Sequence, residues 1–178
     1  KKEGLKCKCL RCREVGHVAV IPAKAGIQSL KLFVDKYEAS GGTEYFLSYE
    51  DTNRDVVYAF CRLRIILPLP RGGAGGVAEV KLPRANAGNS PYPLLERGGY
   101  PAYIRELHTY GQLINIGKKS NGASQHTGMG VKLVKQAEAI CRQNKISKLA
   151  VISGVGVRGY YRKLGYKLEG TYMVKDIK

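Results

Sequence analysis

The chain has 178 residues, enough for one sizeable hydrophobic core but hardly for two domains. Thirty Lys and Arg residues against 14 Asp and Glu residues give a net charge of +16, which favours an anionic partner such as nucleic acid. An acidic protein or an anionic cofactor is the alternative. We find no signal peptide and no apolar run of the about 18 residues that a membrane helix needs, so we expect a cytoplasmic protein without membrane contact.

The first feature along the chain is a basic segment with the pattern C-x-C-x-x-C. Its cysteines are Cys7, Cys9 and Cys12. Such close spacing in a reducing compartment favours a metal site over disulfides. Zinc takes four tetrahedral nitrogen or sulfur ligands, and His17 is a candidate for the fourth. A reduced, disordered tail is the alternative.

Residues 30–66 predict three strands. Alternating apolar and polar residues indicate a strand over 30–37, followed by a turn at 40–43. The runs 45–49 and 56–66 predict a hairpin around a polar turn at 51–54. Residues 68–101 are rich in Gly, Pro and Asn and predict a long loop. The glycines within this loop do not form a P-loop, since the lysine and the following helix are missing.

Residues 102–116 predict the central strand. Alternation places Glu106, His108 and Tyr110 on one face of it. Glu106 or His108 could deprotonate an amine or activate water. A buried polar pair of these two residues is an equally good interpretation.

A glycine-containing loop follows, with Gln125, Gly128 and Gly130. Apolar residues at a period near 3.6 then predict an amphipathic helix over 131–143, and an apolar run predicts a buried strand over 148–153. The first turn of such a helix offers free N–H groups to a pyrophosphate. The alternative is an ordinary helix start that contains glycine. A Rossmann unit is excluded, because G-x-G-x-x-G is absent.

A tyrosine-rich short helix closing on Tyr166 and a last strand over 168–174 complete the chain. Together with the glycine loop, this pattern resembles the GNAT acetyltransferase fold. Several strings further resemble the acetyltransferase domain of the catalytic subunit of Elongator. These strings are residues 9–17, 47–51, 105–111, 125–130, 150–156, 160–166 and 172–175.

The resemblance implies an α/β (α+β) fold with a mixed central sheet flanked by helices over residues 31–178. Residues 1–30 would be the remnant of a cysteine-rich zinc linker. In that family a radical-SAM domain, with an iron–sulfur cluster and S-adenosylmethionine, forms the radical, and the acetyltransferase domain supplies an acetyl group for the wobble uridine of bound tRNA. The chain has no iron–sulfur cysteine triad, so we expect only the back half of such an enzyme, with a radical-SAM domain or polypeptide as a partner.

The resemblance also implies roles for particular residues. Backbone N–H groups of the strand would polarise the thioester of acetyl-CoA, the glycine loop would hold its pyrophosphate, and a tyrosine would protonate the departing CoA thiolate. Tyr161 is the favoured tyrosine and Tyr160 the second candidate; packing of both in the core is the alternative. The remaining acetyl-CoA contacts would be Glu106, Leu107, His108, Thr109, Gln125, Gly128, Met129, Gly130 and Val131.

The function expected from these features is that of an acetyl-CoA-binding acetyltransferase domain of a tRNA wobble-uridine (5-carboxymethyluridine) modifying enzyme. Acetyl-CoA hydrolysis or acetyl transfer would be stimulated by tRNA. A free-standing N-acetyltransferase for proteins or small amines is the first alternative, although its cationic acceptor needs an acidic groove that a charge of +16 disfavours. A non-catalytic tRNA-binding remnant is the second.

Overall fold

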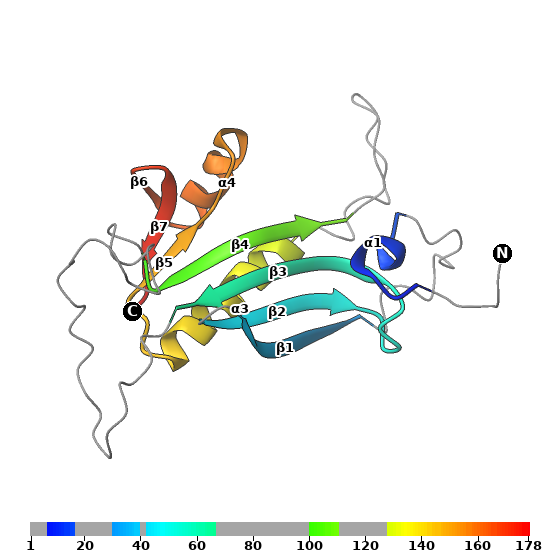
Figure 1. The fold of residues 1–178 in the computed structure, drawn as a ribbon. Coiled ribbons are helices and arrows are strands. Elements are labelled where there is room, and N and C mark those ends of the chain that lie inside the picture. Colours follow the sequence, from blue (N-terminus) through cyan, green and yellow to red (C-terminus); the bar gives the residue numbers. More distant parts are fainter. Residues whose placement is uncertain (1–6, 17–29, 40–41, 67–99, 111–127) are drawn as a thin grey trace, which may run out of the picture. The chain divides into compact units, whose positions relative to one another are not determined.

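The structure is a computed structural model that describes residues 7–16, 30–39, 42–66, 100–110 and 128–178. Its elements are labelled in Figure 1. In chain order they are α1 (Leu10–Arg13), β1 (Lys31–Ala39), β2 (Gly42–Glu50), β3 (Val57–Ile65), β4 (Ala102–Thr109), α3 (Met129–Gln143), β5 (Lys148–Val151), the 3-10 helix η2 (Val155–Val157), α4 (Arg158–Lys163), β6 (Lys167–Glu169) and β7 (Tyr172–Asp176).

The strands form one mixed sheet in the order β1-β2-β3-β4-β5-β7-β6. β4 and β5 are parallel, whereas β5 with β7 and β6 with β7 are antiparallel. Between the parallel strands β4 and β5 the chain passes through α3, as a parallel connection requires. The predicted α/β class with a mixed sheet is confirmed.

The chain divides into two compact units. The segments of the first are Lys1–Asp35, Phe46–Arg62 and Glu106–Ala137, and those of the second are Lys36–Tyr45, Leu63–Arg105 and Glu138–Lys178. Strands β1 to β4 and helix α3 each contribute residues to both units.

In the first unit, a polar turn fixes the predicted hairpin of β2 and β3. The Asp51 carboxylate accepts the backbone N–H groups of Asp55 and Val56 through Oδ1, at 2.8 and 2.6 Å. The segment after α1 joins the start of β3, because the Val15 N–H donates to the Val57 carbonyl at 3.1 Å. The N-terminal cysteine segment is therefore tied to the sheet of this unit.

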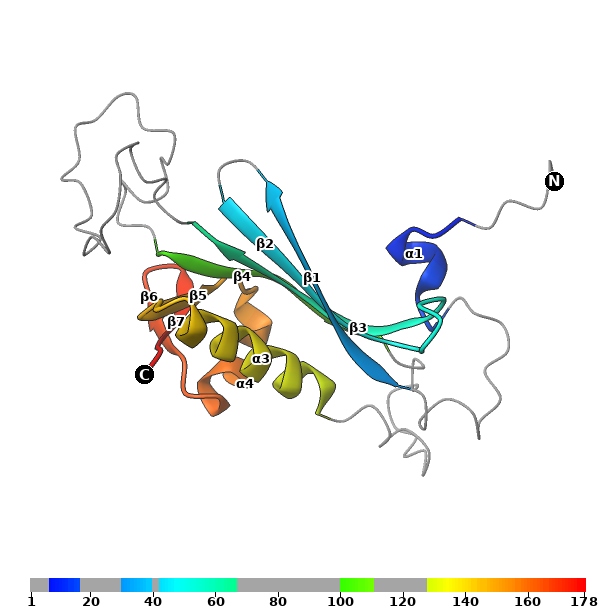
Figure 2. The same cartoon turned by 90° about the horizontal axis from the view of Figure 1, so that it is seen from below.

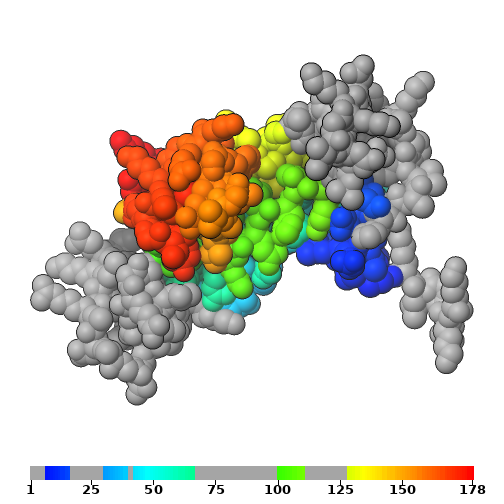
Figure 3. Space-filling view, turned by 90° about the horizontal axis from the view of Figure 1, so that it is seen from above, coloured from blue at the N-terminus to red at the C-terminus, as the bar shows by residue number. Residues whose placement is uncertain are grey.

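The second unit has an aromatic-rich core. Ile66, Tyr103, Ala150 and Val174 are buried together, with two partly buried tyrosines packed against them. The parallel ladder of β4 and β5 contributes Tyr103 and Ala150 to this core and ends at the pair Ile104 and Val151. Elements β5, α4, β6 and β7 lie together in Figures 1 and 2, and in the space-filling view of Figure 3 this C-terminal segment, orange to red, forms one continuous surface.

Helix α3 is amphipathic as predicted and runs without interruption in Figure 2. Its buried apolar side chains are Met129, Leu133, Val134, Ala137, Ile140 and Cys141. Among the described residues, no helix has both the length and the apolar character needed to cross a membrane.

Several predicted boundaries were wrong; β2, for example, begins at Gly42, within the predicted turn at 40–43. Helix α3 begins at Met129, two residues before the predicted start, and β5 ends at Val151 rather than residue 153. β4 ends at Thr109, leaving Tyr110 outside the strand, while residues 111–116 of the predicted strand lie outside the described residues. The predicted loop at 68–101 also lies outside them, except for its last two residues.

The predicted last strand, residues 168–174, is in fact a hairpin of β6 and β7. Glu169 pairs with Tyr172, so only Gly170 and Thr171 form the turn. Gly170 has φ +58°, while Thr171 is not among the residues with positive φ. A glycine with positive φ at the first of two turn positions is typical of a type II′ hairpin.

Candidate functional site

Strand β4 carries the predicted residues Glu106, Leu107, His108 and Thr109, all in the first unit. The neighbouring strand β3 supplies a partner for the acid, because Arg62 Nη1 donates to Glu106 Oε1 at 3.0 Å. The Glu106 side chain is 38% exposed, and His108 is exposed as well. A buried pair of Glu106 with His108 is therefore not formed, and that interpretation was wrong.

Aromatic rings lie on the same face as Glu106. His108 stacks on Phe60 of β3 at a centroid distance of 5.0 Å, and Phe60 stacks on Phe46 of β2 at 5.3 Å. Tyr110 lies 6.3 Å from His108 and is nearly parallel to it. The predicted alternation, with Glu106, His108 and Tyr110 on one face, is consistent with these contacts.

The glycine loop meets α3 at Gly128, also in the first unit. Gly128 has φ +102°, a backbone conformation that a side chain would strain. The Lys132 N–H donates to the Gly128 carbonyl at 2.9 Å, which closes the first helical turn. The N–H groups of Met129, Gly130 and Val131 precede that bond and have no intrahelical acceptor. Gln125 lies outside the described residues.

The two tyrosines belong to α4, in the second unit. Tyr161 is 5% exposed and packs edge to face against Tyr160 at 5.1 Å and Tyr166 at 5.9 Å. Tyr160 is only half-buried. The Tyr166 hydroxyl donates to Glu138 Oε1 at 3.0 Å, which holds this aromatic group in place. Core packing thus applies to Tyr161, whereas the Tyr160 side chain is partly exposed although its hydroxyl oxygen is buried.

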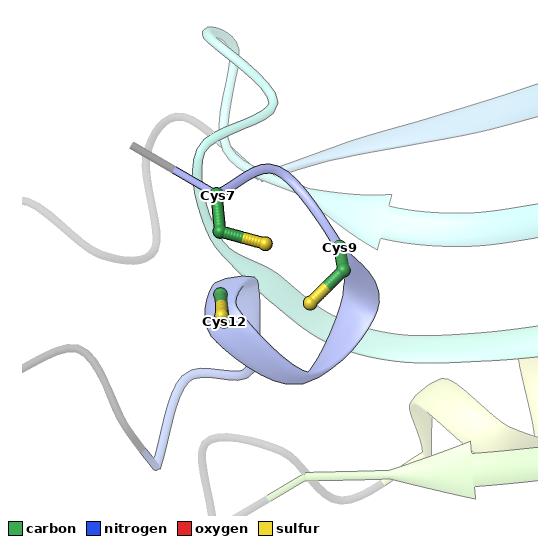
Figure 4. Close-up of side chains that lie close together, drawn as sticks. All are labelled: Cys7, Cys9 and Cys12. Atoms are coloured by element: carbon green, nitrogen blue, oxygen red, sulfur yellow. The ribbon is translucent and has the colours of Figure 1, made fainter. Parts of the chain in front are cut away.

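The N-terminal cysteines gather at one point, and Figure 4 shows their sulfur atoms facing a common space. The Sγ atoms of Cys7, Cys9 and Cys12 all lie within 4.8 Å of one another. Tetrahedral zinc, with Zn–S bonds of about 2.3 Å, holds sulfur atoms about 3.8 Å apart, so the three thiols fit such an ion after a small closure. The predicted fourth ligand, His17, lies outside the described residues.

Hydrogen bonds within the cluster separate the thiol pKa values. The Cys12 backbone N–H and then the side chains of Cys7 and Cys12 lower the pKa of Cys9 to about 7. The hydrogen bond with Cys9 raises the pKa of Cys12 to about 11. The remaining cysteines, Cys61 and Cys141, are buried, and burial raises the pKa of Cys141 to about 12. Cys9 therefore offers a thiolate more readily than Cys12 does.

Comparison with known proteins identifies what the whole chain is similar to. It is 40% identical over 98% of its length to a tRNA uridine(34) acetyltransferase of Methanocaldococcus jannaschii, and 37% identical over its full length to Elongator complex protein 3 of Homo sapiens. The solved structure of Methanocaldococcus infernus Elp3 with an N-terminal deletion matches 97% of the chain, with 38% identity and a TM-score of 0.66. No family model matches.

The chain is a homologue of one segment of the Elp3-type proteins. It spans 29% of the M. jannaschii protein, 28% of the human protein and 36% of the solved M. infernus chain. The resemblance to the catalytic subunit of Elongator and the mixed α/β fold, both predicted from the sequence, are confirmed.

The chain also contains a charge cluster that was not predicted from the sequence. Arg13, next to Cys12, donates through Nη1 to Glu50 Oε2 at 2.7 Å. Arg54 donates to the same oxygen at 3.2 Å and also pairs with Asp35. Glu50 is fully buried. A charged residue directly after the predicted strand at 45–49 was the signal that could have revealed this anchor for the cysteine helix α1.

Proposed function

We propose that this Elp3-type segment binds acetyl-CoA and supplies its acetyl group in the modification of the tRNA wobble uridine. The observation that carries the proposal is the 40% identity over 98% of the chain to a tRNA uridine(34) acetyltransferase. The relatives are longer by a factor of about three, so the complete reaction, with an iron–sulfur cluster and S-adenosylmethionine, is assigned to a radical-SAM domain or polypeptide acting with this segment in the cytoplasm. The basic charge of the chain suits tRNA as its substrate.

In this proposal the start of α3 holds the pyrophosphate of acetyl-CoA. The N–H groups of Met129, Gly130 and Val131 point out of the helix N-terminus, where the helix dipole favours negative charge. Gly128 provides the sharp backbone turn into the helix. Gln125 would be a further contact of acetyl-CoA, as the resemblance implies. The support from the structure is the positive φ of Gly128 immediately before a fifteen-residue helix.

The thioester carbonyl would lie along the second half of β4. Backbone N–H groups between Glu106 and Thr109 would donate to its oxygen and stabilise the negative charge that develops when water or another nucleophile attacks the carbonyl carbon. The carbon–sulfur bond then breaks, and the CoA thiolate takes a proton. Glu106 is engaged by Arg62, so a role for it as a general base would require that ion pair to open.

A tyrosine of α4 would supply that proton. Tyr161 was the favoured candidate from sequence, and Tyr160 is the more accessible side chain in the structure. Loss of a general acid slows the step by roughly 10²–10⁴-fold. Tyr160→Phe and Tyr161→Phe remove only the hydroxyl, so the variant with the larger loss of thiol release identifies the acid.

The cysteine cluster would hold a zinc ion. Cys7, Cys9 and Cys12 supply three thiolates, and His17 or a ligand from another polypeptide would be the fourth. Such an ion would fix α1, which buries none of its own residues, against the sheet. Residues 1–30 would then act as a structural linker preceding the acetyltransferase domain at 31–178.

The experiment is release of free CoA thiol from acetyl-CoA, with and without bulk tRNA. Stimulation by tRNA, with loss in one of the two tyrosine variants, is the expected result. Thiol release that depends on an added amine and ignores tRNA would favour the free-standing N-acetyltransferase. Absence of release under all conditions, with salt-sensitive tRNA binding retained, would make the segment a tRNA-binding remnant.

A further inference from the structure

Three neighbouring strands of the first unit carry a row of stacked rings. Phe46 lies on β2, Phe60 on β3 and His108 on β4, which are adjacent in the sheet. The successive centroid distances are 5.3 and 5.0 Å, with interplanar angles of 28° and 23°. Neighbouring strands are about 4.8 Å apart, so the rings follow the strand spacing and stand face to face across the sheet.

The central ring of the row is buried, and the ring at one end is exposed to solvent. Phe60 is 3% exposed, whereas His108 is exposed. Tyr110 flanks both, at 6.0 Å from Phe60 and 6.3 Å from His108. His108 is thus held between a buried ring, Phe60, and a half-buried ring, Tyr110, although its own ring meets solvent.

No further strand continues the row beyond His108 within the described part of the chain. The ladder of β4 with β5 ends at Ile104 and Val151, four residues before His108. On that side β4 has no strand partner at residues 106–109 among the residues that the structure describes. Within the described residues, no strand therefore takes the place of the next ring in the row.

We propose that His108, supported by Phe60 and flanked by Tyr110, is a stacking site for a single unpaired nucleobase of the RNA substrate. This proposal rests on the proposed function, since it names the part of the tRNA that this face of β4 receives. Proteins that read single-stranded RNA stack splayed bases on Phe, Tyr or His side chains. The net charge of +16 favours the phosphates that accompany such a base.

The polar pair on the same face suits a pyrimidine edge. Arg62 and Glu106 are hydrogen-bonded to each other at 3.0 Å and are both partly exposed, at 28% and 38%. Together they present guanidinium donors and carboxylate oxygens close to the stacked ring. Uracil carries an N–H donor between two carbonyl acceptors, which is the complementary set. His108 would provide the stacking energy. The pair of Arg62 and Glu106 would select which base is bound.

The test uses an anticodon stem–loop RNA with uridine at the wobble position and the same RNA with an abasic residue there. Fluorescence anisotropy measures both affinities for the intact chain. Base stacking on an aromatic side chain changes affinity by roughly 5- to 150-fold, so the uridine RNA should bind more tightly by that factor. His108→Ala should lose most of this preference, the remainder coming from Arg62 and Glu106, and His108→Phe, which keeps an aromatic ring, should retain it.

The salt dependence of RNA binding distinguishes base stacking from contacts with phosphate groups. Loss of a phosphate contact lowers the slope of log affinity against log salt, whereas loss of a base contact does not. His108→Ala should therefore keep the slope of the unmodified chain. Tyr37→Ala is the control, because Tyr37 is another exposed tyrosine of the sheet, at 43%, and should keep both the preference and the slope.

Equal binding of the two RNAs by the unmodified chain, or an undiminished preference in His108→Ala, would overturn the proposal. Coenzyme A binding is measured in parallel without RNA, and a loss there instead of in RNA binding would assign the ring to the adenine of the cofactor. Thiol release from acetyl-CoA is scored separately. A preserved uridine preference without thiol release would disprove the proposed activity but not the base site.

Discussion

Glu50 holds a negative charge inside the first unit, with two guanidinium groups beside it. Arg13 and Arg54 share its Oε2 oxygen, and the Ser48 hydroxyl donates to Oε1 at 2.6 Å. The carboxylate is thus satisfied by three side chains, of which Ser48 and Arg54 are close to it in sequence and Arg13 is 37 positions away. Its removal would leave Arg13, whose side chain is 13% exposed, as a poorly solvated and unpaired cation.

We expect Glu50→Gln to lower the free energy of unfolding by roughly 3 kcal/mol, as for the loss of one partner of a buried ion pair. Urea denaturation measures the change. Glu169→Gln is the matched control, because the pair of Glu169 with Lys148 is exposed on both sides and should change stability by less than about 1 kcal/mol. Equal effects of the two substitutions would contradict the role assigned to Glu50.

Asp35 makes the stability of the first unit depend on pH in the acidic range. Its hydrogen bonds with Arg54 hold the pKa of its carboxyl below the ordinary value of 3.8. A carboxyl with a lowered pKa stabilises the folded state above its unfolded pKa, and this contribution is lost as the pH falls through the folded value. Urea midpoints from pH 6 down to pH 2.5 should therefore decline less steeply in Asp35→Asn. A parallel decline in both proteins would show that Asp35 contributes little.

At the scale of single elements, the start of α3 depends on one backbone angle. Gly128 has φ +102° and nothing within 4 Å of the position that a Cβ would take, so backbone strain rather than crowding opposes a side chain there. Gly159, within α4, also has open space around it but no positive φ. The two glycines differ in conformation alone.

We expect Gly128→Ala to destabilise the chain by roughly 1–3 kcal/mol and to weaken acetyl-CoA binding, because alanine resists positive φ. Gly159→Ala should be neutral or slightly stabilising, since alanine favours a helix more than glycine does. Thermal unfolding and isothermal titration with acetyl-CoA measure the two effects. If Gly128→Ala matches Gly159→Ala in both, the loop does not need its positive φ.

The same elements show how far the sequence could predict the fold. Polar turns between apolar runs located β2 and β3, and helical periodicity located α3, because both signals are local. The start of α3 was misplaced because Gly128 and Gly130 look alike in sequence, and only one has positive φ. The β6–β7 turn was missed because Gly170 lies in a run that otherwise resembles one strand.

The contacts within the candidate site could not be predicted from local sequence patterns. Arg62 and Glu106 are 44 positions apart, and Arg13 and Glu50 are 37 apart. Such pairs depend on the register between strands, which no spacing within either segment reveals. Motif resemblance located β4, the start of α3, the tyrosines and the cysteines, whereas the ring row of Phe46, Phe60 and His108 required the sheet order.

At the scale of the whole molecule, net charge governs the approach of RNA. With a formal charge of +16, binding to tRNA should be driven largely by release of counterions. If four phosphates are neutralised, affinity should fall about 100-fold between 50 and 200 mM salt. Filter binding across that range measures the slope. An affinity that changes less than about threefold would exclude phosphate contacts as the main contribution.

The exposed and the buried cysteines should react with thiol reagents at different rates, so their reactivity reports whether metal is bound and whether the chain is folded. Cys7, Cys9 and Cys12 are exposed, whereas Cys61 and Cys141 are buried, and Cys141 is further protected by a pKa raised to about 12. A thiol reagent should therefore modify only the three exposed cysteines in the metal-free chain, Cys9 faster than Cys12 because their pKa values are about 7 and about 11. It should modify none of them rapidly once zinc is bound, and all five cysteines after denaturation. Counting reactive thiols during purification would report metal occupancy and unfolding in a single assay, without any knowledge of the substrate.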